Sequence, residues 1–526
     1  MTQLTQEAQI LSQIISEPQE RKSLLGEETI SVSKAVSMAA VIYEAARNAI
    51  EFRAEHLIRR AAIERILKRR IMINPTGRGT AEALIKELLW ARYLENGSIP
   101  KKIVEEIQKT IDKYLLFRQE IIKTKSPREK KYFSDWILGI ASCEIEKKLV
   151  PAPKREALIN FVYRTLRKKI IFPFEENQKT YNMQIYIATH RGFALSDEPI
   201  IRFHLFISFF PDWMDFRFEE ALKIVPYFEG TLKEIESQLN YPLKDQLRRR
   251  VLKEAAPFNV IRDLIEEYPL EFKKIILNPQ ILEEKIKKIL NKKYQETKNK
   301  LKRAAIRGII YIFLTKMIFA FILEIPFELL IKKINYFSLI VNSLFPPFLM
   351  FLVTTSIKIP GEENTNKIIE KIKEYIYINQ PIKTKIEINS LTKRKITNFV
   401  FTPIYFLTYI LIFGGVIFLL SKAHFNVLSQ IIFLFFLSVV SFFGYRIRLL
   451  TKDYEIEEKE GILAPILDFL FLPILRIGQW LSRELAHINI LIFIFDFIIE
   501  APFKAFFEVI EQWIHFIKIK KEEITT

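Results

Sequence analysis

The sequence predicts an all-α protein in which a soluble helical N-terminal region precedes a polytopic α-helical membrane domain and C-terminal amphipathic helices. Three observations predict this class. Glycine is scarce, with 14 residues among 526, which disfavours turn-rich β architectures. The first 300 residues carry most of the charge, and capping signals there precede apolar residues at helical spacing. The long apolar runs lie after Ile306.

Length and hydropathy divide the chain into segments that need different solvents. A chain of 526 residues is long enough for two or three domains, and its mean hydropathy of +0.10 averages over a charged half and an apolar half. We expect six segments: a mobile tail over 1–30, a basic cytoplasmic helical region over 31–303, a first transmembrane hairpin over 304–357, a cytoplasmic loop over 358–397, a second transmembrane hairpin over 398–446, and interfacial amphipathic helices with a tail over 447–526.

Successive capping signals predict a series of helices in the N-terminal region. Ser31 or Ser33 is placed to cap a helix that runs to about Ile71. Ser126 and Glu129 have the spacing of a capping box, with a proline in the first turn. The short connections between these helices imply antiparallel packing. The expected helices cover 31–71, 80–94, 101–123, 126 onward, 218–225, 231–239, 243–255, 260–268 and 279–303.

Residues 168–210 are the one stretch where strands compete with helices. Met183, Ile185 and Ile187 alternate with other residues as in a strand, and the apolar residues of 201–207 do the same. Against this, the segment 196–199 is typical of a helix start with acids in the first turn. The run that follows it is apolar on almost every face, so we favour helix.

Four apolar runs are long enough to cross a bilayer, which takes about 20 residues in a helix. The run at 399–420 is the strongest, and the run at 336–356 contains Pro346 and Pro347. The expected spans are 308–323, 336–356, 399–420 and 428–445.

The distribution of Lys and Arg predicts the orientation of these spans. The loop 357–397 and the region before Gly308 are rich in basic residues, whereas 421–429 contains only Lys422. Basic loops stay on the cytoplasmic side, so four crossings place both termini in the cytoplasm of a multi-pass plasma-membrane protein. Lys332 and Lys333, between the first two spans, oppose this assignment.

The C-terminal segment contains two shorter apolar runs that charges interrupt. The run 462–481 includes Asp468 and Arg476, and the run 488–509 includes Asp496 and Glu500. Aromatic residues mixed with charges favour helices that lie in the headgroup region. Packing against the membrane bundle and a re-entrant pair stay open as alternatives.

Lys316 is the first candidate site residue because it lies near the middle of the first span. A charge at that depth costs roughly 3 kcal/mol or more, so it needs a partner, water or a shift to the neutral form. One hypothesis makes it a pathway residue paired with Asp468 or Asp496. The other makes it a structural pair inside the bundle or a snorkelling side chain, and we favour that one.

Glu324 and Glu500 are candidates because each stands two residues before a proline in two similar segments, 318–327 and 494–503. A proline frees a backbone carbonyl near the carboxylate, which suits a cation or proton site in a broken membrane helix. In the structural alternative, which we favour, the Glu marks the headgroup boundary and the proline redirects the chain. The i,i+4 spacing of Asp496, Glu500 and Lys504 also permits a local ion pair.

The sequence contains no recognisable catalytic, cofactor or metal motif. The segment 77–79 lacks the remaining glycines of a dinucleotide loop and the Gly-Lys-Ser/Thr of a phosphate loop. The six histidines are scattered without the paired spacing of a zinc site. Cys143 is the single cysteine, which excludes an intramolecular disulfide and fits a reducing compartment. We therefore expect no cofactor and lean against an enzyme.

The net charge of +18 suits a membrane protein as well as a nucleic-acid binder, since basic residues flank the spans. We expect a lipid bilayer, anionic lipid head groups and a protein partner of the cytoplasmic region as partners, with a second copy of the chain as a further candidate, and we do not expect nucleic acid. The function we favour is a membrane-anchored scaffold or regulatory protein. The alternative is an oligomeric transporter or channel lined by the charged residues of the membrane helices.

The predicted topology is testable by cysteine labelling in intact cells. A cysteine at Asn426 should react with an impermeant reagent added from outside, because the poorly basic loop 421–429 is expected there. A cysteine at Asn364 should not react. The reverse labelling would show that the orientation is wrong.

Overall fold

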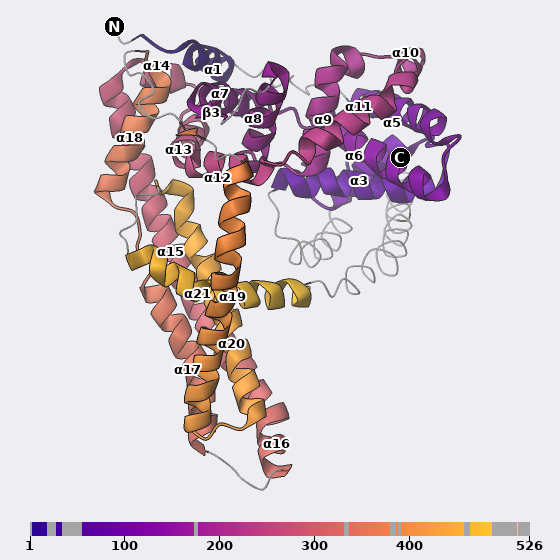
Figure 1. The fold of residues 1–526 in the computed structure, drawn as a ribbon. Coiled ribbons are helices and arrows are strands. Elements are labelled where there is room, and N and C mark those ends of the chain that lie inside the picture. The colour runs from indigo at the N-terminus through magenta and orange to yellow at the C-terminus, as the bar shows by residue number, and fades with distance from the viewer. Residues whose placement is uncertain are drawn as a thin grey trace, which may run out of the picture. The chain divides into compact units, whose positions relative to one another are not determined.

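The computed structural model describes residues 3–17, 28–33, 55–172, 177–330, 336–378, 386–387, 391–456, 463–486 and 513. These residues are mostly helical with few short strands, which confirms the all-α prediction (Figure 1). The chain forms two compact units. Unit 1 consists of 1–17, 160–181 and 245–488, and unit 2 consists of 18–159, 182–244 and 489–526. The segment 31–303 therefore contributes to both units.

Unit 2 is a set of helices with one small antiparallel ladder. The capping box predicted at Ser126 is present, since the Ser126 side chain accepts from the Glu129 amide. A helix also starts within 196–199 as expected, and the Asp197 side chain accepts from the Ile200 amide. The helix expected to start at Ser31 or Ser33 has its segment 34–54 outside the described residues. The described elements of unit 2 are β1 (Thr29–Ile30), α3 (Glu55–Ile73), α4 (Thr80–Trp90), β2 (Ile99–Pro100), α5 (Lys101–Ile122), α6 (Pro127–Leu149), the first part of α7 (Pro153–Lys169), most of α8 (Gln178–Gly192), α9 (Glu198–Phe209), η1 (Pro211–Met214), α10 (Phe218–Leu222) and α11 (Val225–Leu239).

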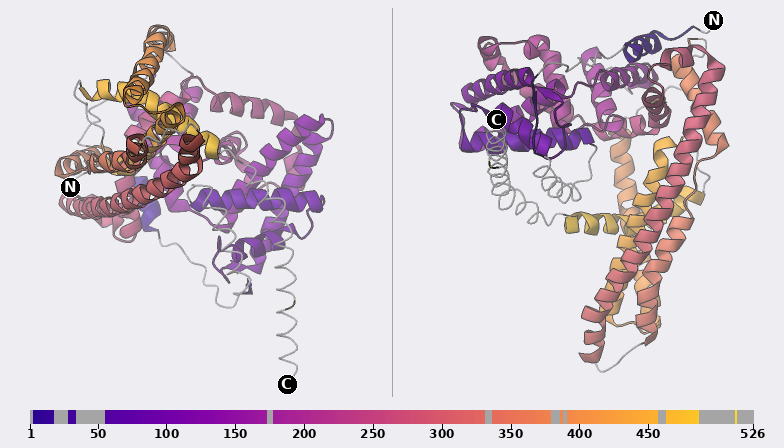
Figure 2. Two further views of the ribbon diagram at one scale, coloured as in Figure 1. Left: turned by 90° about the horizontal axis from the view of Figure 1, so that it is seen from below. Right: turned by 180° about the vertical axis from the view of Figure 1, so that it is seen from behind.

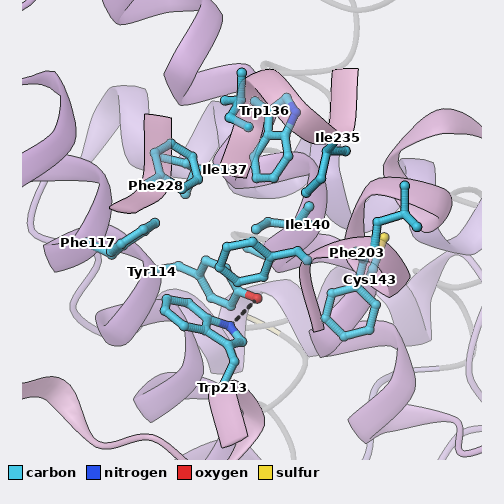
Figure 3. Close-up of a cluster of buried hydrophobic side chains, with 14 of the residues drawn as sticks. Tyr114, Phe117, Trp136, Ile137, Ile140, Cys143, Phe203, Trp213, Phe228 and Ile235 are labelled. Carbon is cyan, nitrogen blue, oxygen red and sulfur yellow. Dashed lines mark hydrogen bonds between the residues drawn. The ribbon is translucent and has the colours of Figure 1, made fainter. Parts of the chain in front are cut away.

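An aromatic cluster holds α5, α6, α9 and α11 together (Figure 3). Trp213 is completely buried and lies edge-on to Tyr114, Phe117 and Phe206 with ring centroids 5.0–5.3 Å apart. Its indole N–H donates to the Tyr114 hydroxyl at 2.8 Å, so the polar end of each ring is satisfied inside the core. Trp136 and Phe228 extend the cluster with centroids 5.3 Å apart.

The ambiguous stretch 168–210 is mainly helical, as favoured, and forms the end of α7, then α8 and α9. Only Ile170 and Ile171 form a strand, β3, which pairs in parallel with β4 (Ile386–Glu387). Helix prevails in α9 because Asp197 caps it and Pro199 occupies its first turn, and both features belong to helix starts.

Unit 1 combines a helical base with the apolar helices. The N-terminal segment, expected as a mobile tail, contains α1 (Gln6–Ser16), and the Thr5 amide donates to the Ile376 carbonyl at 2.8 Å. The further elements of unit 1 are α12 (Lys244–Lys253), α13 (Ala255–Glu267), α14 (Phe272–Leu277), α15 (Pro279–Phe319), η2 (Ala320–Glu324), α16 (Ile325–Leu330), α17 (Tyr336–Thr355), α18 (Glu362–Ile376), α19 (Leu391–Lys422), α20 (Val427–Arg448), η3 (Leu449–Tyr454) and α21 (Leu463–Ala486), with α1 covering Gln6–Ser16.

Four helices among the described residues are long and apolar enough to cross a membrane. They lie in Pro279–Leu330, Tyr336–Thr355, Thr402–Lys422 and Val427–Tyr454, in agreement with the four runs found in the sequence. Most of their apolar surface is not covered by other protein: only 11% of the apolar window in Thr402–Lys422 is buried. Such continuous apolar exposure is unsuited to water, and it marks the chain as an α-helical membrane protein.

Helix α15 differs from its prediction. The sequence predicts a helix over 279–303 and a separate span from 308, but the structure has one unbroken helix of 41 residues. The reason lies in residues 300–305, which are Lys, Leu, Lys, Arg and two Ala, all good helix formers, and no proline occurs within 299–307. Gly308 does not break the helix, since it is buried where α15 approaches Met350 of α17 and Phe443 of α20.

Helix α18 lies within the predicted loop 358–397 and packs on α13 and α15 through buried isoleucines. Asn364 is held in this base, where its side-chain amide donates to the Tyr294 hydroxyl at 2.8 Å and the Tyr454 carbonyl at 2.7 Å. The exposed neighbour Glu362 is therefore a better labelling position than Asn364.

Glycines set the closest approaches between the apolar helices, which lie side by side in two views (Figure 1, Figure 2). A Cβ on Gly444 of α20 would stand 2.4 Å from a Val353 methyl of α17. A Cβ on Gly478 would stand 2.0 Å from the Ser438 carbonyl oxygen, so α21 packs directly on the backbone of α20. Helix α21 is thus docked on the bundle, one of the alternatives left open for this segment.

We predict that Gly444→Ala destabilises the protein while Gly414→Ala does not. The added methyl at 444 must displace Val353 and separate α17 from α20, at a cost of about 1–3 kcal/mol. At Gly414 of α19 nothing lies within 4 Å of the new methyl, so only the favourable helix propensity of Ala remains. Thermal unfolding of the two purified variants in one detergent tests this. Equal unfolding temperatures would contradict the observed helix packing.

Candidate functional site

The structure brings together two of the five residues proposed from the sequence. Lys316 of α15 and Glu324 of η2 form a buried ion pair. Asp468 falls in α21 at a position whose side chain is not among the described ones, and Asp496 and Glu500 lie outside the described residues. Lys316 is therefore paired within the helical stretch formed by α15 and η2. Among the described residues, no contact joins Lys316 to the C-terminal segment 447–526.

The Lys316 ammonium donates to Glu324 Oε1 at 2.5 Å, and the two side chains are 0% and 1% exposed. The ammonium also lies 5.3 Å from the centre of the Phe436 ring, a favourable cation–π distance. Both charges are therefore surrounded by protein although they lie among apolar helices, where an unpaired charge is costly.

A π-helical segment produces this pairing. Residues eight apart on a uniform α-helix point roughly 80° away from each other. The five residues of η2 (Ala320–Glu324) adopt the wider π-helix, which rotates Glu324 towards the face that carries Lys316. Single π-turns of this kind occur frequently at functional sites.

Polar side chains of α16, α17 and α20 extend the pair into a network. Asn342 of α17 donates from its side-chain amide to Glu324 Oε1 at 2.6 Å and to the Ser429 carbonyl at 3.2 Å. Asn426 caps α20 by accepting from the Ser429 amide, and its own amide donates to Glu328 Oε1 at 3.3 Å. We call Lys316, Glu324, Glu328, Asn342 and Asn426 the intramembrane polar cluster.

Some buried acceptors of this cluster have no hydrogen-bond donor among the described residues. Glu324 Oε2 and Asn342 Oδ1 are such acceptors, in side chains that are each 1% exposed. Rotating the Asn342 amide by 180° does not remove the deficit, because its nitrogen already faces two acceptors, Glu324 Oε1 and the Ser429 carbonyl. A buried acceptor without a donor costs about 1–3 kcal/mol, so the hydrogen bonding of the cluster is incomplete within the described residues.

Sequence reasoning missed Asn342, Glu328 and Asn426. Asn342 is the one amide within an otherwise apolar run, and Glu328 follows Glu324 by four residues on one helix face. These two signals were available in the sequence. The contact between α16 and the start of α20 depends on helix packing, and no local pattern encodes it.

Unit 2 contains a second candidate, a partly open cavity of about 70 Å³ between α6, α7, α8 and α9. Two histidines line it with ring centroids 4.8 Å apart. His190 Nδ1 lies 3.0 Å from the Ser196 hydroxyl, and its Nε2 is buried without a hydrogen-bond partner. Lys147, Arg155 and Glu156 also line this space.

Burial sets the protonation of these groups. Burial first, then the nearby charges of His204 and Arg155, hold the pKa of His190 well below its usual value. Burial lowers the pKa of His204 to about 4 although Glu156 opposes the change. Burial raises the pKa of the Cys143 thiol well above its usual value, so this cysteine is not a reactive thiolate. Among the described residues no group of His, Cys, Asp and Glu has the arrangement of a metal site.

Comparisons with protein family models, with curated proteins and with solved structures find no match to this chain.

We predict that Lys316→Met destabilises the protein because it strands the Glu324 carboxylate. Breaking a buried ion pair by removing one partner costs about 3–5 kcal/mol. The double variant Lys316→Met, Glu324→Gln carries neither charge and should regain most of that loss. Thermal unfolding in detergent measures both effects. Additive losses in the double variant would contradict the pairing.

We predict that α8 and α9 lose stability as the pH falls. The folded protein holds the pKa of His204 at about 4, against an ordinary value of 6.5. The unfolded chain therefore binds more protons between these values, and the contribution to stability that is present above about pH 6.5 is lost as the pH approaches 4. The loss should be on the order of 1–3 kcal/mol.

Hydrogen exchange of α8 and α9 in the full-length protein, expressed as protection factors at each pH, measures this effect. His204→Phe should flatten the pH dependence, whereas His424→Phe, at an exposed loop position, should not change it. A slope that persists in His204→Phe would refute the assignment.

Proposed function

We propose that this protein is a membrane-anchored scaffold or regulatory protein whose helical region outside the bilayer binds another protein. The observation that carries the proposal is the continuity of α15. One helix of 41 residues contributes both to the helical base of unit 1 and to the apolar bundle. A helix of this length spans roughly 60 Å. A displacement of the helical base of unit 1 is therefore transmitted to the apolar bundle without an intervening hinge.

The base that surrounds the start of α15 supports this reading. Leu282, Ile286 and Ile289 are buried there, and α15 packs on α13, α14 and α18. Charged contacts add to the apolar ones: Lys373 of α18 donates to Glu283 at 2.8 Å. Because α13, α14 and α18 pack around the first turns of α15, protein contacts hold this end of the helix. The apolar end of α15 packs on α17 and α20.

A second charged group ties α18 to the rest of the base. Glu254 accepts from Lys169 at 3.0 Å, from Lys371 at 3.1 Å and from the Tyr375 hydroxyl at 2.7 Å. Burial tends to raise the pKa of Glu254, but the two lysines and Tyr375 outweigh burial and lower it. The carboxylate therefore stays ionised and holds α18 on the base. A base fixed in this way is suited to binding a partner protein.

We place the base and unit 2 on the cytoplasmic side of the plasma membrane, with both termini there. The support is the excess of Lys and Arg in 357–397 and before Gly308. The same basic residues are suited to anionic lipid head groups, each contributing on the order of 1 kcal/mol near the surface. Unit 2 is then available to a cytoplasmic protein partner, and a second copy of the chain is another candidate partner.

A transporter or channel is the second candidate function, and the intramembrane polar cluster favours it. Charged residues buried among membrane helices mark ion or proton pathways in other membrane proteins. Lys316 is already paired with Glu324 in a salt bridge, however. The described parts of α17 and α20 contain no further charged residue within their apolar runs. We rank this function second because a pathway needs polar groups from one membrane face to the other.

Photo-crosslinking in intact membranes tests the first proposal. A photoreactive residue at the exposed Tyr132 or Tyr227 of unit 2 should give a discrete protein adduct. The matched control is the exposed Ile410 of α19, which should react with lipid only. Absence of any adduct from several exposed positions of unit 2, together with ion flux in vesicles that Lys316→Met abolishes, would favour the transporter instead.

A further inference from the structure

The cavity of unit 2 contains ring nitrogens that no described residue satisfies. His190 is 2% exposed, and its Nε2 has no hydrogen-bond partner among the described residues. The half-buried His204 makes ring contacts with Tyr186 and His190, but neither of its nitrogens forms a hydrogen bond with the part of the chain that the structure describes. Buried polar groups are normally hydrogen-bonded, so a molecule in this cavity completes bonding that these residues leave open.

The size of the cavity suits the end of a small molecule. Its volume is about 70 Å³. A protein cavity of about 150 Å³ binds benzene, so this one takes roughly three or four non-hydrogen atoms. Val150, Ile159 and Ile200 supply apolar walls. The cavity is partly open, so the remainder of a longer ligand extends outward past Lys147 and Glu156.

The two histidines determine which polar group fits. Burial lowers the pKa of His204 to about 4 and holds the pKa of His190 well below its usual value, so both rings are neutral at neutral pH. A neutral imidazole has one N–H donor and one acceptor nitrogen. His204 therefore offers both, and His190 Nε2 offers whichever its Nδ1 does not use towards the Ser196 hydroxyl. A hydroxyl or a primary amide also donates and accepts, whereas a carboxylate only accepts.

The charged residues at the opening favour an uncharged ligand. Lys147 donates to Glu156 at 3.1 Å, and Arg59 donates to Glu146 at 2.7 Å. Arg155 lies close enough to Glu146 and Glu156 for both carboxylates to act on its guanidinium. These cations thus have carboxylate neighbours within the protein. An anionic ligand has to compete with those carboxylates, and an uncharged ligand does not.

We propose that this cavity binds the uncharged end of a small molecule that carries a hydroxyl or a primary amide. His190 Nε2 and the ring nitrogens of His204 hydrogen-bond the polar group, and the apolar walls contact the carbon atoms beside it. A metal ion fits less well, because no group of three or more His, Cys, Asp and Glu among the described residues could hold one. The site goes beyond the scaffold function, which uses the outer surface of unit 2.

Acetamide and acetate are the matched probes, since they have nearly the same shape and differ in charge. Nuclear magnetic resonance of the full-length protein in detergent, with ¹⁵N-labelled histidine, follows their binding. The two ring signals are assigned by their loss in His190→Phe and His204→Phe. At about pH 7.5, where acetate is ionised, acetamide should shift both signals saturably and acetate should not. Concentrations up to about 100 mM are needed, because so small a molecule has limited affinity.

Two variants should lose the site, and a third is the matched control. Ala152→Phe places a ring at the opening from an exposed position and should weaken acetamide binding at least about tenfold. His204→Phe removes a donor and an acceptor and should weaken it to a similar extent. Asn160→Phe, at an exposed position of α7 that does not line the cavity, should bind acetamide as the wild type does.

Thermal unfolding without the probes shows whether each variant is folded. If His204→Phe is not folded, the comparison of Ala152→Phe with Asn160→Phe decides alone. Histidine signals that acetamide leaves unchanged in the wild type overturn the proposal, because the cavity then holds only water. Shifts by acetate as large as those by acetamide also overturn it, and so does a folded Ala152→Phe that binds acetamide as tightly as the wild type.

Discussion

The pairing of Lys316 with Glu324 is the interaction on which the arrangement of the apolar helices depends. A lysine at that depth is tolerated only with a partner, and the partner lies in the π-helical segment that follows. The pair in turn orients Asn342, whose amide bridges Glu324 and the Ser429 carbonyl. The need to pair Lys316 therefore connects α15, α17 and α20 through one group of polar contacts. The glycines at 308 and 444 let the helix backbones approach each other.

Much of the fold could be predicted from the sequence, because the signals are local. Ser126 caps its helix as its spacing to Glu129 indicates, and α9 starts within 196–199 as expected. The four apolar runs coincide with the four candidate crossings. The continuity of α15 was missed because a change of polarity at residue 303 suggested a boundary. Helix propensity does not change there, and the backbone follows propensity and not polarity.

The candidate site could be predicted only in part. Lys316 and Glu324 stand out because charges are rare in apolar runs, but their pairing could not be derived from α-helical periodicity. The π-turn changes the angle between the Lys316 and Glu324 side chains, and no residue type in the sequence predicts such a turn. The contact of Asn426 with Glu328 joins residues 98 apart in the chain and exists only after packing. The same holds for β3 and β4, two-residue strands that pair over a long sequence separation.

The direct contact of Gly478 with the Ser438 carbonyl limits which residues this helix crossing can accept. A Cβ at position 478 would stand 2.0 Å from the Ser438 carbonyl oxygen and 2.7 Å from the Phe442 Cβ. Because a helix backbone cannot move aside as a flexible side chain can, even alanine at this position would force α21 away from α20. Sequence drift at position 478 is therefore confined to glycine for as long as α21 stays on α20.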